Sequence, residues 1–303
     1  MQDPAGSIMR PFEYVPVLSV DEACAQLARY GQDASILAGG TDLLIEWRRT
    51  VGESPKAVVD ISRIEDLSGI VSDDGIVSLK PLTTLSDLLK SPIIREFAPL
   101  LATAASSIGS PQIRNRGTVG GNIMNAATCA DTVPPLIALR ATVTLQSKRG
   151  ARQLGLADLF LKPYHTRATP DEVLTDIRFP KPSARTRSAF IKLGRRNALS
   201  ISRLSVAALL EQDNNGVIMN TCIVPGAALP TWQRVAEAET MLVGEKPSAS
   251  LFAAAGKKVS EVMIAQTGRR WSTEYKEPVI AVLVRRALEQ CTEQNVMQKG
   301  AEA

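Results

Sequence analysis

The 303-residue sequence predicts an α+β protein of about two domains. Up to about residue 180, short apolar strand segments alternate with helical segments. Beyond that point strand candidates follow one another, and after them the pattern is helical only. Mixed elements followed by a small sheet and a group of helices are typical of an α+β protein with separate domains.

The first half begins with a well-marked helix. Ser19 at the N-cap position and Glu22 three residues later resemble a capping box, and Gly31 is a natural helix end. The apolar segment 34–38 then predicts a buried strand, which Gly39-Gly40 interrupts before a turn into a short helix. Further strands are predicted at 57–61, 76–79 and 141–146.

The helices of the middle segment are marked by their capping residues. Thr84 is expected to cap a helix over 85–90. Ser91-Pro92 predicts the start of a single helix that runs to roughly Ser106, because proline suits the first helical position. Another helix is predicted at 133–139.

The last part of the chain reads as a small sheet followed by helices. Asn214-Asn215-Gly216 is a hairpin signal between two strand segments. The predicted strands are 173–179, 189–193, 204–211 and 217–224. The predicted helices are 231–243, 248–266 and 274–292.

Composition argues against nucleic-acid and membrane roles. The net charge is only +4, and aromatic residues make up 4% of the chain, too few for a stacking surface on single-stranded nucleic acid. The sequence has no long apolar run of membrane-spanning length. Residues 1–8 lack the features of a secretory signal, Met9 is a candidate natural start, and the cytoplasm is the predicted location.

The sequence also contains few residues that could form a metal site or activate a catalytic nucleophile. The four cysteines form no Cys-x-x-Cys motif, so this chain shows no local zinc or iron–sulfur framework. His165 is the only histidine, and any Ser-His-Asp or Cys-His site would depend on it. We therefore predict no metal site and no catalytic side chain.

Two glycine pairs are the informative motifs: Ala38-Gly39-Gly40-Thr41-Asp42 and Thr118-Val119-Gly120-Gly121-Asn122. Glycine allows positive φ and close approach of a ligand to the backbone, and successive amides can form an anion site. Two such loops could hold one diphosphate from both sides. Each could also be a simple tight turn, and neither Gly-x-Gly-x-x-Gly nor Gly-x-x-x-x-Gly-Lys-[Ser/Thr] is present.

Together with the stretch from Gly109 to Ile123, these loops resemble the FAD-binding medium subunit of molybdenum hydroxylases. This is the family of xanthine dehydrogenase, aldehyde oxidoreductase and carbon monoxide dehydrogenase. The resemblance extends from Phe12 to about Leu288, and later landmarks at 170–174, 190–196 and 272–275 fit it as well.

The resemblance implies a fold and its division. It implies a two-subdomain FAD-binding domain of the PCMH/VAO type over 9–180, with a boundary near residue 62. A C-terminal domain of a small antiparallel sheet and helices over 181–292 would follow.

The resemblance also implies a set of cofactor-binding residues, with the diphosphate on 38–43 and 118–122 and non-covalently bound FAD. The expected contacts are Leu37, Ala38, Gly39, Gly40, Thr41, Asp42, Leu43, Gly117, Thr118, Gly120, Gly121, Asn122, Met124, Asn125, Ala130, Asp131, Val173, Leu174 and Lys192.

Several polar residues of these segments could have a role other than cofactor binding. Asp131 suits a sugar hydroxyl but could equally cap the helix before Val133. Lys192 could reach the flavin ring or lie on the surface, and it lacks the acidic residue that many relatives carry where Ser200 stands. Arg114 and Arg116 could face phosphate or dock another subunit.

Segment 161–169 departs from the glycine-rich form of the family. Tyr164 and His165 could therefore lie near the flavin.

The implied function is electron transfer. Relatives receive electrons from two [2Fe–2S] clusters on a small subunit, while a large subunit carries molybdopterin, and FAD passes electrons to NAD⁺ or another acceptor. An (αβγ)₂ assembly is expected. Two alternatives remain: a self-sufficient FAD-dependent oxidase or reductase of the same fold, and an assembly protein that has lost FAD.

Overall fold

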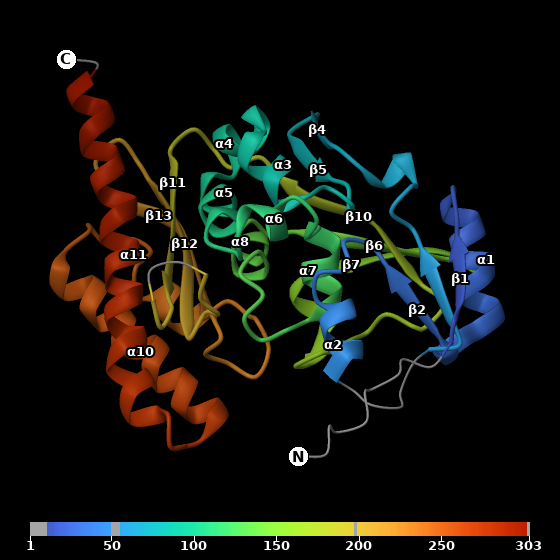
Figure 1. Ribbon diagram of the computed structural model, residues 1–303. Coiled ribbons are helices and arrows are strands. Elements are labelled where there is room, and N and C mark those ends of the chain that lie inside the picture. Colours follow the sequence, from blue (N-terminus) through green and yellow to red (C-terminus); the bar gives the residue numbers. More distant parts are fainter. Residues whose placement is uncertain (1–10, 50–54, 197–198, 302–303) are drawn as a thin grey trace.

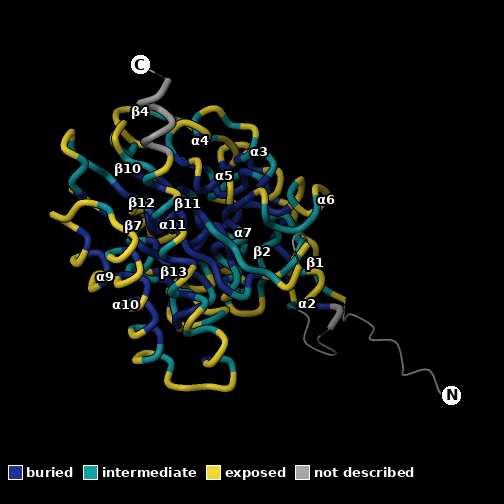
Figure 2. The backbone as a smooth tube through the Cα atoms, turned by 90° about the vertical axis from the view of Figure 1, so that its left-hand side faces the viewer, coloured by how far each residue is buried: buried dark blue, intermediate teal, exposed yellow. Residues whose placement is uncertain are grey.

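The computed structural model describes residues 11–49, 55–196 and 199–301. The candidate start at Met9 therefore lies outside the described residues. Figure 1 shows three parts in a row: a small sheet with α1 at one end, a central part rich in helices, and a second sheet covered by long helices at the other end. Buried backbone lies mainly in the interior of the molecule, and exposed backbone lies mainly at its outside (Figure 2).

The first part is a parallel three-stranded sheet with the order β1–β3–β2. Its elements are β1 (Glu13–Pro16), α1 (Val20–Tyr30), β2 (Ala34–Leu37), α2 (Leu43–Arg49) and β3 (Ala57–Asp60). Ala23, Cys24 and Leu27 of α1 are buried in one apolar cluster with Val59 of β3. This burial holds the end of β2, and with it the first glycine loop, in place.

The second part is an antiparallel five-stranded sheet with the order β4–β5–β10–β6–β7. Its strands are β4 (Ile70–Asp73), β5 (Ile76–Leu79), β6 (Thr142–Ser147), β7 (Gly150–Gly155) and β10 (Val173–Pro180). Its helices are α3 (Leu85–Lys90), α4 (Pro92–Phe97), α5 (Pro99–Ser106), α6 (Pro111–Arg114), α7 (Val119–Asn125) and α8 (Val133–Ala138). A two-stranded ribbon of β8 (Phe160–Lys162) and β9 (His165–Thr166) lies between β7 and β10 in the chain.

The third part is an antiparallel sheet, β11–β12–β13, packed against helices. Its elements are β11 (Thr186–Leu193), β12 (Leu204–Gln212), β13 (Ile218–Gly226), α9 (Ala236–Thr240), α10 (Ala249–Thr267) and α11 (Thr273–Ala301). Gly256 lets α10 approach α11 closely, since a Cβ there would lie 2.3 Å from the Ala281 carbonyl oxygen. The α+β class is confirmed.

The predicted helix caps are confirmed. Ser19, Thr84 and Ser91 each accept a hydrogen bond from an amide in the first turn of the helix that follows. Gly31 ends α1 with a φ of 55°. Local capping chemistry was therefore a reliable guide to where these helices begin.

The prediction of one helix from Pro92 to Ser106 is wrong. The chain breaks at Ala98, which has φ −144° and ψ 51°, and α4 and α5 are separate helices. Proline disfavours the helical conformation of the residue before it, and Pro99 places that restriction on Ala98. Proline thus both starts α5 and ends α4.

The predicted helix over 231–243 is also mostly absent, because only α9 is helical there. The Val235 amide donates to the Ile223 carbonyl of β13 at 3.0 Å. Trp232 is buried against Phe160, with ring centroids 4.5 Å apart. These tertiary contacts outweigh the helical periodicity of the segment.

Candidate cofactor site

A cavity of about 780 Å³ lies where the three parts of the chain meet. Its walls come from 36–46 in the first part, from segments between 81 and 131 and from β10 in the second, and from β11 and the segment after it in the third. Cofactor pockets commonly measure about 300–1,000 Å³. The cavity is therefore large enough for a dinucleotide.

The first glycine loop touches the residues directly before the second loop along one wall of this cavity. A Cβ on Gly39 would lie 2.0 Å from the carbonyl oxygen of Arg116, so no side chain fits there. Asn125 Nδ2 donates to Asp42 Oδ2 at 3.1 Å and joins the loops a second time. Segments some eighty residues apart in sequence thus form a single surface.

The first loop presents free backbone donors. Within the described chain, none of the amides of Gly39, Gly40, Thr41, Asp42 and Leu43 donates a hydrogen bond to the protein. Gly40 has a φ of 71°, a conformation that favours glycine. Consecutive unpaired amides beside a cavity form a ready anion site.

The second loop differs from the expectation that both loops would offer bare amides. The amides of Val119, Gly120, Gly121 and Asn122 donate to Thr83 O, Pro81 O, Thr118 Oγ1 and Thr118 O. Gly120 is needed because a Cβ there would lie 2.5 Å from Pro81 Cβ. The second glycine pair therefore allows α7 to pack against the turn before α3, and it shapes the wall rather than supplying amides.

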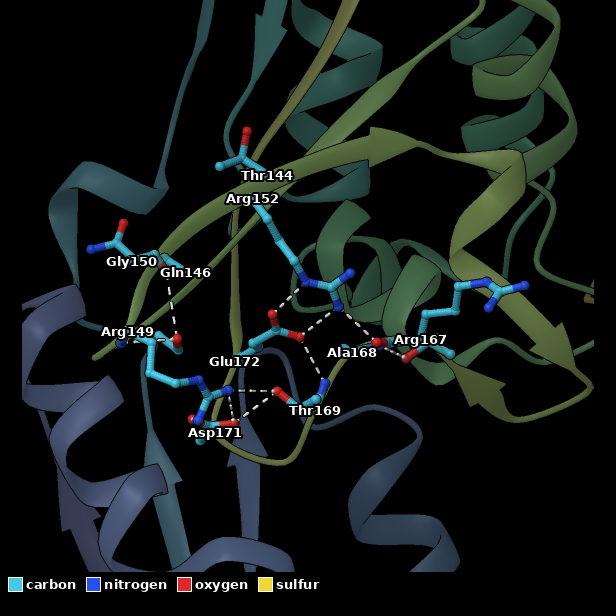
Figure 3. A network of polar contacts seen from close by, with 12 residues as sticks. Thr144, Gln146, Arg149, Gly150, Arg152, Arg167, Ala168, Thr169, Asp171 and Glu172 are labelled. Carbon is cyan, nitrogen blue, oxygen red and sulfur yellow. Dashed lines mark hydrogen bonds and ion pairs between the residues drawn. The ribbon is translucent and has the colours of Figure 1, made fainter.

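The start of β10 is fixed by the polar network shown in Figure 3. Glu172 is buried and accepts from Arg152 Nε at 2.6 Å, from Arg152 Nη2 at 2.9 Å and from the Thr169 amide at 2.7 Å. The Arg152 guanidinium lowers the pKa of Glu172. Val173 and Leu174 follow directly and line the cavity, so this network positions an apolar wall.

A buried ionic network joins the second and third parts at the cavity. Lys192 Nζ donates to Asp131 Oδ2 at 2.8 Å and to the Ser107 carbonyl at 2.9 Å. Ser202 Oγ donates to Asp131 Oδ1 at 2.6 Å. Burial raises the pKa of Asp131, while Lys192 and Ser202 act in the opposite direction.

The contacts of this network decide between the alternatives that the sequence left open for Asp131 and Lys192. Asp131 is not a helix cap, because Thr132 holds the N-cap position of α8 and makes no side-chain cap bond. Lys192 is not a surface side chain, since it is 13% exposed, and Asp131 supplies the charged partner that Ser200 could not. Both oxygens of Asp131 are engaged by protein donors, so a sugar hydroxyl would have to share them.

Replacing Ser202 by alanine is expected to lower the free energy of unfolding by about 2 kcal/mol, because a hydrogen bond to a charged buried acceptor is lost. The Ser202 bond favours the ionised form of Asp131 and so holds its pKa down. The loss should therefore shrink as the solution is made more acidic and Asp131 takes up a proton. Urea unfolding of both proteins from neutral into acidic pH tests this, and a pH-independent difference would contradict it.

The structure brings almost all predicted cofactor residues together. Every one of them lines the cavity except Leu37, whose Cδ1 instead lies 3.1 Å from the position that a Cβ on Gly40 would occupy. Sequence reasoning missed further lining residues, which are Ile36, Glu46, Ile61, Pro81, Leu82, Leu85, Ile108, Gly109, Ser110, Ile113, Ala127, Cys129, Leu199, Ser200, Ile201 and Ser202.

Other candidates lie elsewhere. Arg114 Nη1 donates to the carbonyls of Ile108 and Gly109 and so stabilises the preceding turn, and Arg114 does not line the cavity. Tyr164 is 62% exposed, and neither it nor His165 lines the cavity. The expectation that these two side chains approach the flavin is therefore not supported.

Among the residues that the structure describes, no three His, Cys, Asp or Glu side chains cluster as metal ligands. The four cysteines are unpaired. Within the same residues, no helix is long and apolar enough to cross a membrane.

The residues present fit FAD. Five free amides at one wall suit a diphosphate, and a mostly apolar lining with few polar groups suits flat ring systems. Lys192 and Asp131 provide charge at another wall.

Comparison with known proteins agrees with this geometry. Residues 10–182 match the model of the FAD binding domain in molybdopterin dehydrogenase, and 188–291 match the CO dehydrogenase flavoprotein C-terminal domain. The nicotinate dehydrogenase FAD-subunit of Eubacterium barkeri is 35% identical over 244 residues, which cover 78% of this chain and 81% of the relative. The carbon monoxide dehydrogenase medium chain of Hydrogenophaga pseudoflava is 32% identical over 277 residues, 91% of this chain and 96% of the relative.

A solved structure is similar along nearly the whole chain. It is the carbon monoxide dehydrogenase from Hydrogenophaga pseudoflava that lacks the Mo-pyranopterin moiety of the molybdenum cofactor. The TM-score is 0.88 at 32% identity, and the match covers 94% of this chain and 99% of that one. Together with the cavity and its free amides, these matches lead to one conclusion: the chain belongs to the family of FAD-binding subunits of molybdenum-containing dehydrogenases, and FAD is its cofactor.

Proposed function

We propose that this chain is the electron-transfer subunit of a molybdenum hydroxylase complex. Electrons would arrive from [2Fe–2S] clusters on a partner chain and leave through FAD to NAD⁺ or another acceptor. The observation that carries the proposal is the cavity at the meeting point of the three parts, with free amides on one wall and the Lys192–Asp131 pair on another.

The walls suggest how FAD would lie. The amides of 39–43 would bind the diphosphate, since all five are consecutive and donate to no acceptor among the described residues. The Lys192 ammonium has three N–H groups, and the described residues accept only two of them. Its third N–H would serve the flavin ring system, where a positive charge favours the reduced form.

The protein's own contribution is binding and environment. When bound, FAD supplies one- and two-electron redox chemistry. The side chains of this cavity hold the cofactor, exclude water from its apolar faces and set the local charge. No nucleophile or general base is assigned to the chain.

The proposed assembly follows from the relatives. The partners would be a molybdopterin-binding large subunit and a [2Fe–2S] small subunit, in an (αβγ)₂ complex in the cytoplasm. The proposed division of this chain is a FAD-binding domain over 9–180, with its two subdomains meeting near residue 62, and a C-terminal domain over 181–292.

The test is reconstitution of the purified chain with FAD. We expect one bound flavin per chain by absorbance after removal of free FAD, and no hydroxylase activity of the chain alone, because in the proposed complex hydroxylation takes place at the molybdenum centre of the large subunit. Absence of bound flavin would contradict the proposal and favour an assembly protein that keeps only the fold.

The second candidate, a self-sufficient oxidase or reductase, predicts a different result. Such an enzyme would reduce its FAD with an organic substrate in the absence of partner chains. Flavin bleaching by a substrate without an iron–sulfur chain would favour it over the electron-transfer role.

A further inference from the structure

A group of cations without acidic partners lies on the third part of the molecule, outside the set of residues that line the cavity. Arg203, Arg270 and Lys276 have no carboxylate within ion-pair distance among the described residues. The first two lie close enough to Lys276 to help lower its pKa, after the larger effect of burial. Neighbouring like charges of this kind are compensated well by an opposite charge from outside.

The positions of these cations are fixed by the fold. Lys276 Nζ donates to the Ala227 carbonyl at 2.7 Å, and Arg270 Nε donates to the Thr267 carbonyl at 3.0 Å. The Arg203 guanidinium lies over the Tyr275 ring, 5.5 Å from its centroid. Less side-chain freedom is then lost when a partner binds.

Aromatic side chains stand among the cations. Trp271 is 93% exposed and Tyr275 is 44% exposed. A tryptophan so exposed is unusual, and tryptophan, tyrosine and arginine are the residues that most often dominate protein–protein interfaces. The acids of the same segment are Glu274 in the first turn of α11 and Glu277, which pairs with Arg269 at 3.1 Å.

This surface adjoins the mouth of the cofactor cavity. Ile201 and Ser202 line the cavity, and Arg203 follows them in the chain. Ile201 is 76% exposed, so an apolar side chain of the cavity lining is open to solvent two residues before Arg203. A protein seated here would lie next to the edge of the cofactor cavity that Ile201 and Ser202 form.

The shape favours a protein over a small ligand. Neither the cofactor cavity nor a second cavity of about 180 Å³ is lined by Arg203 or by residues of 269–276. Nucleotides and other small molecules are usually enclosed in concave sites. An open surface of fixed cations and protruding aromatic rings suits a protein face.

We propose that the surface formed by Arg203, Arg270, Trp271, Tyr275 and Lys276 docks an acidic face of the iron–sulfur partner chain. This assignment of the partner rests on the proposed electron-transfer function. The cations would pair with its carboxylates, Trp271 would enter an apolar spot between them, and the position beside the cavity mouth would bring the electron donor near the flavin.

The test uses the complex with its co-expressed partner chains and the variants Arg270→Glu and Trp271→Ala. Each is expected to weaken binding of the iron–sulfur chain at least about tenfold, and the binding of the wild type should weaken with rising salt. Lys246→Glu is the matched control, because Lys246 is an exposed lysine of the same part outside this surface. Iron and flavin content per chain and titration of the separated partner report the result.

The outcomes distinguish failure of the docking proposal from failure of the proposed electron-transfer function. Wild-type affinity for the iron–sulfur chain in both variants would overturn the docking proposal, even if FAD binds as expected. A loss of NADH affinity with the partner fully retained would also overturn it, in favour of a nucleotide site. A wild-type chain that binds no FAD but loses its iron–sulfur partner in the two variants would contradict the proposed function and leave the docking surface supported.

Discussion

Substitution of Gly39 by alanine is expected to weaken FAD binding about 100-fold. The new Cβ would lie 2.0 Å from the Arg116 carbonyl oxygen and 3.2 Å from Gly117 Cα, and all of these neighbours are backbone. One glycine loop must therefore move away from the other. Overpacking of this kind costs about 1–3 kcal/mol, and each 1.4 kcal/mol lost from binding is a factor of ten.

The displaced amides are those that remain free for the diphosphate, which is why the effect should appear in affinity. Gly256→Ala is the matched control, because its Cβ would meet the Ala281 carbonyl oxygen at 2.3 Å in the packing of α10 on α11. Both variants should lower the unfolding temperature. Only Gly39→Ala should also lower the affinity for FAD by more than the loss of stability explains. Fluorescence titration with FAD measures it, and equal affinities in the two variants would refute the assigned role of the first loop.

The meeting of the two glycine loops could be predicted from the sequence, but their chemistry could not. Both have the same local pattern, a glycine pair after an apolar residue and before a polar one. The difference lies in long-range partners: Pro81 and Thr83 accept the amides of Gly120 and Val119, whereas none of the described residues accepts the amides of Gly39 or Gly40. Hydrogen bonds between distant segments leave no local signal in a sequence.

The same limit explains the missed contribution of the third part to the site. Ser202 lies in a short polar segment between two strands, and nothing local distinguishes its hydroxyl from that of Ser200. Its 2.6 Å bond to Asp131 depends on how the sheet β11–β12–β13 packs against the central part. By contrast, Lys192 was found because it belongs to a recognisable motif.

The secondary structure likewise divides into elements that local sequence signals determine and elements that long-range contacts determine. Caps such as Ser19 and Thr84 act within one turn, and their helices were placed correctly. The break at Ala98 also has a local sequence signal, because Pro99 follows it. The continuous apolar pattern of α4 and α5 nevertheless favoured the prediction of one helix. The irregular chain around Val235 depends on its bond to β13 and was beyond local prediction.

Substitution of Lys192 by methionine is expected to lower the free energy of unfolding by about 3–5 kcal/mol, because it leaves a buried carboxylate without its counter-ion. The side chains of Lys192 and Asp131 are 13% and 4% exposed, so solvent screens the pair little. Lys192 also holds the pKa of Asp131 down, and its removal should raise that pKa further. The destabilisation should therefore be largest at high pH and should ease as the pH falls and Asp131 becomes protonated.

The double variant Lys192→Met/Asp131→Asn separates loss of the lysine from loss of the pair. An uncharged asparagine keeps a possible acceptor for Ser202 and needs no counter-ion, so the double variant should regain most of the stability. Flavin binding gives the second readout: if the third N–H of Lys192 serves the cofactor, the double variant should still bind FAD more weakly than the wild type. Urea unfolding of the four proteins gives the coupling energy between the two side chains. A coupling near zero would mean that the ion pair does not join the central and C-terminal parts at the cofactor cavity.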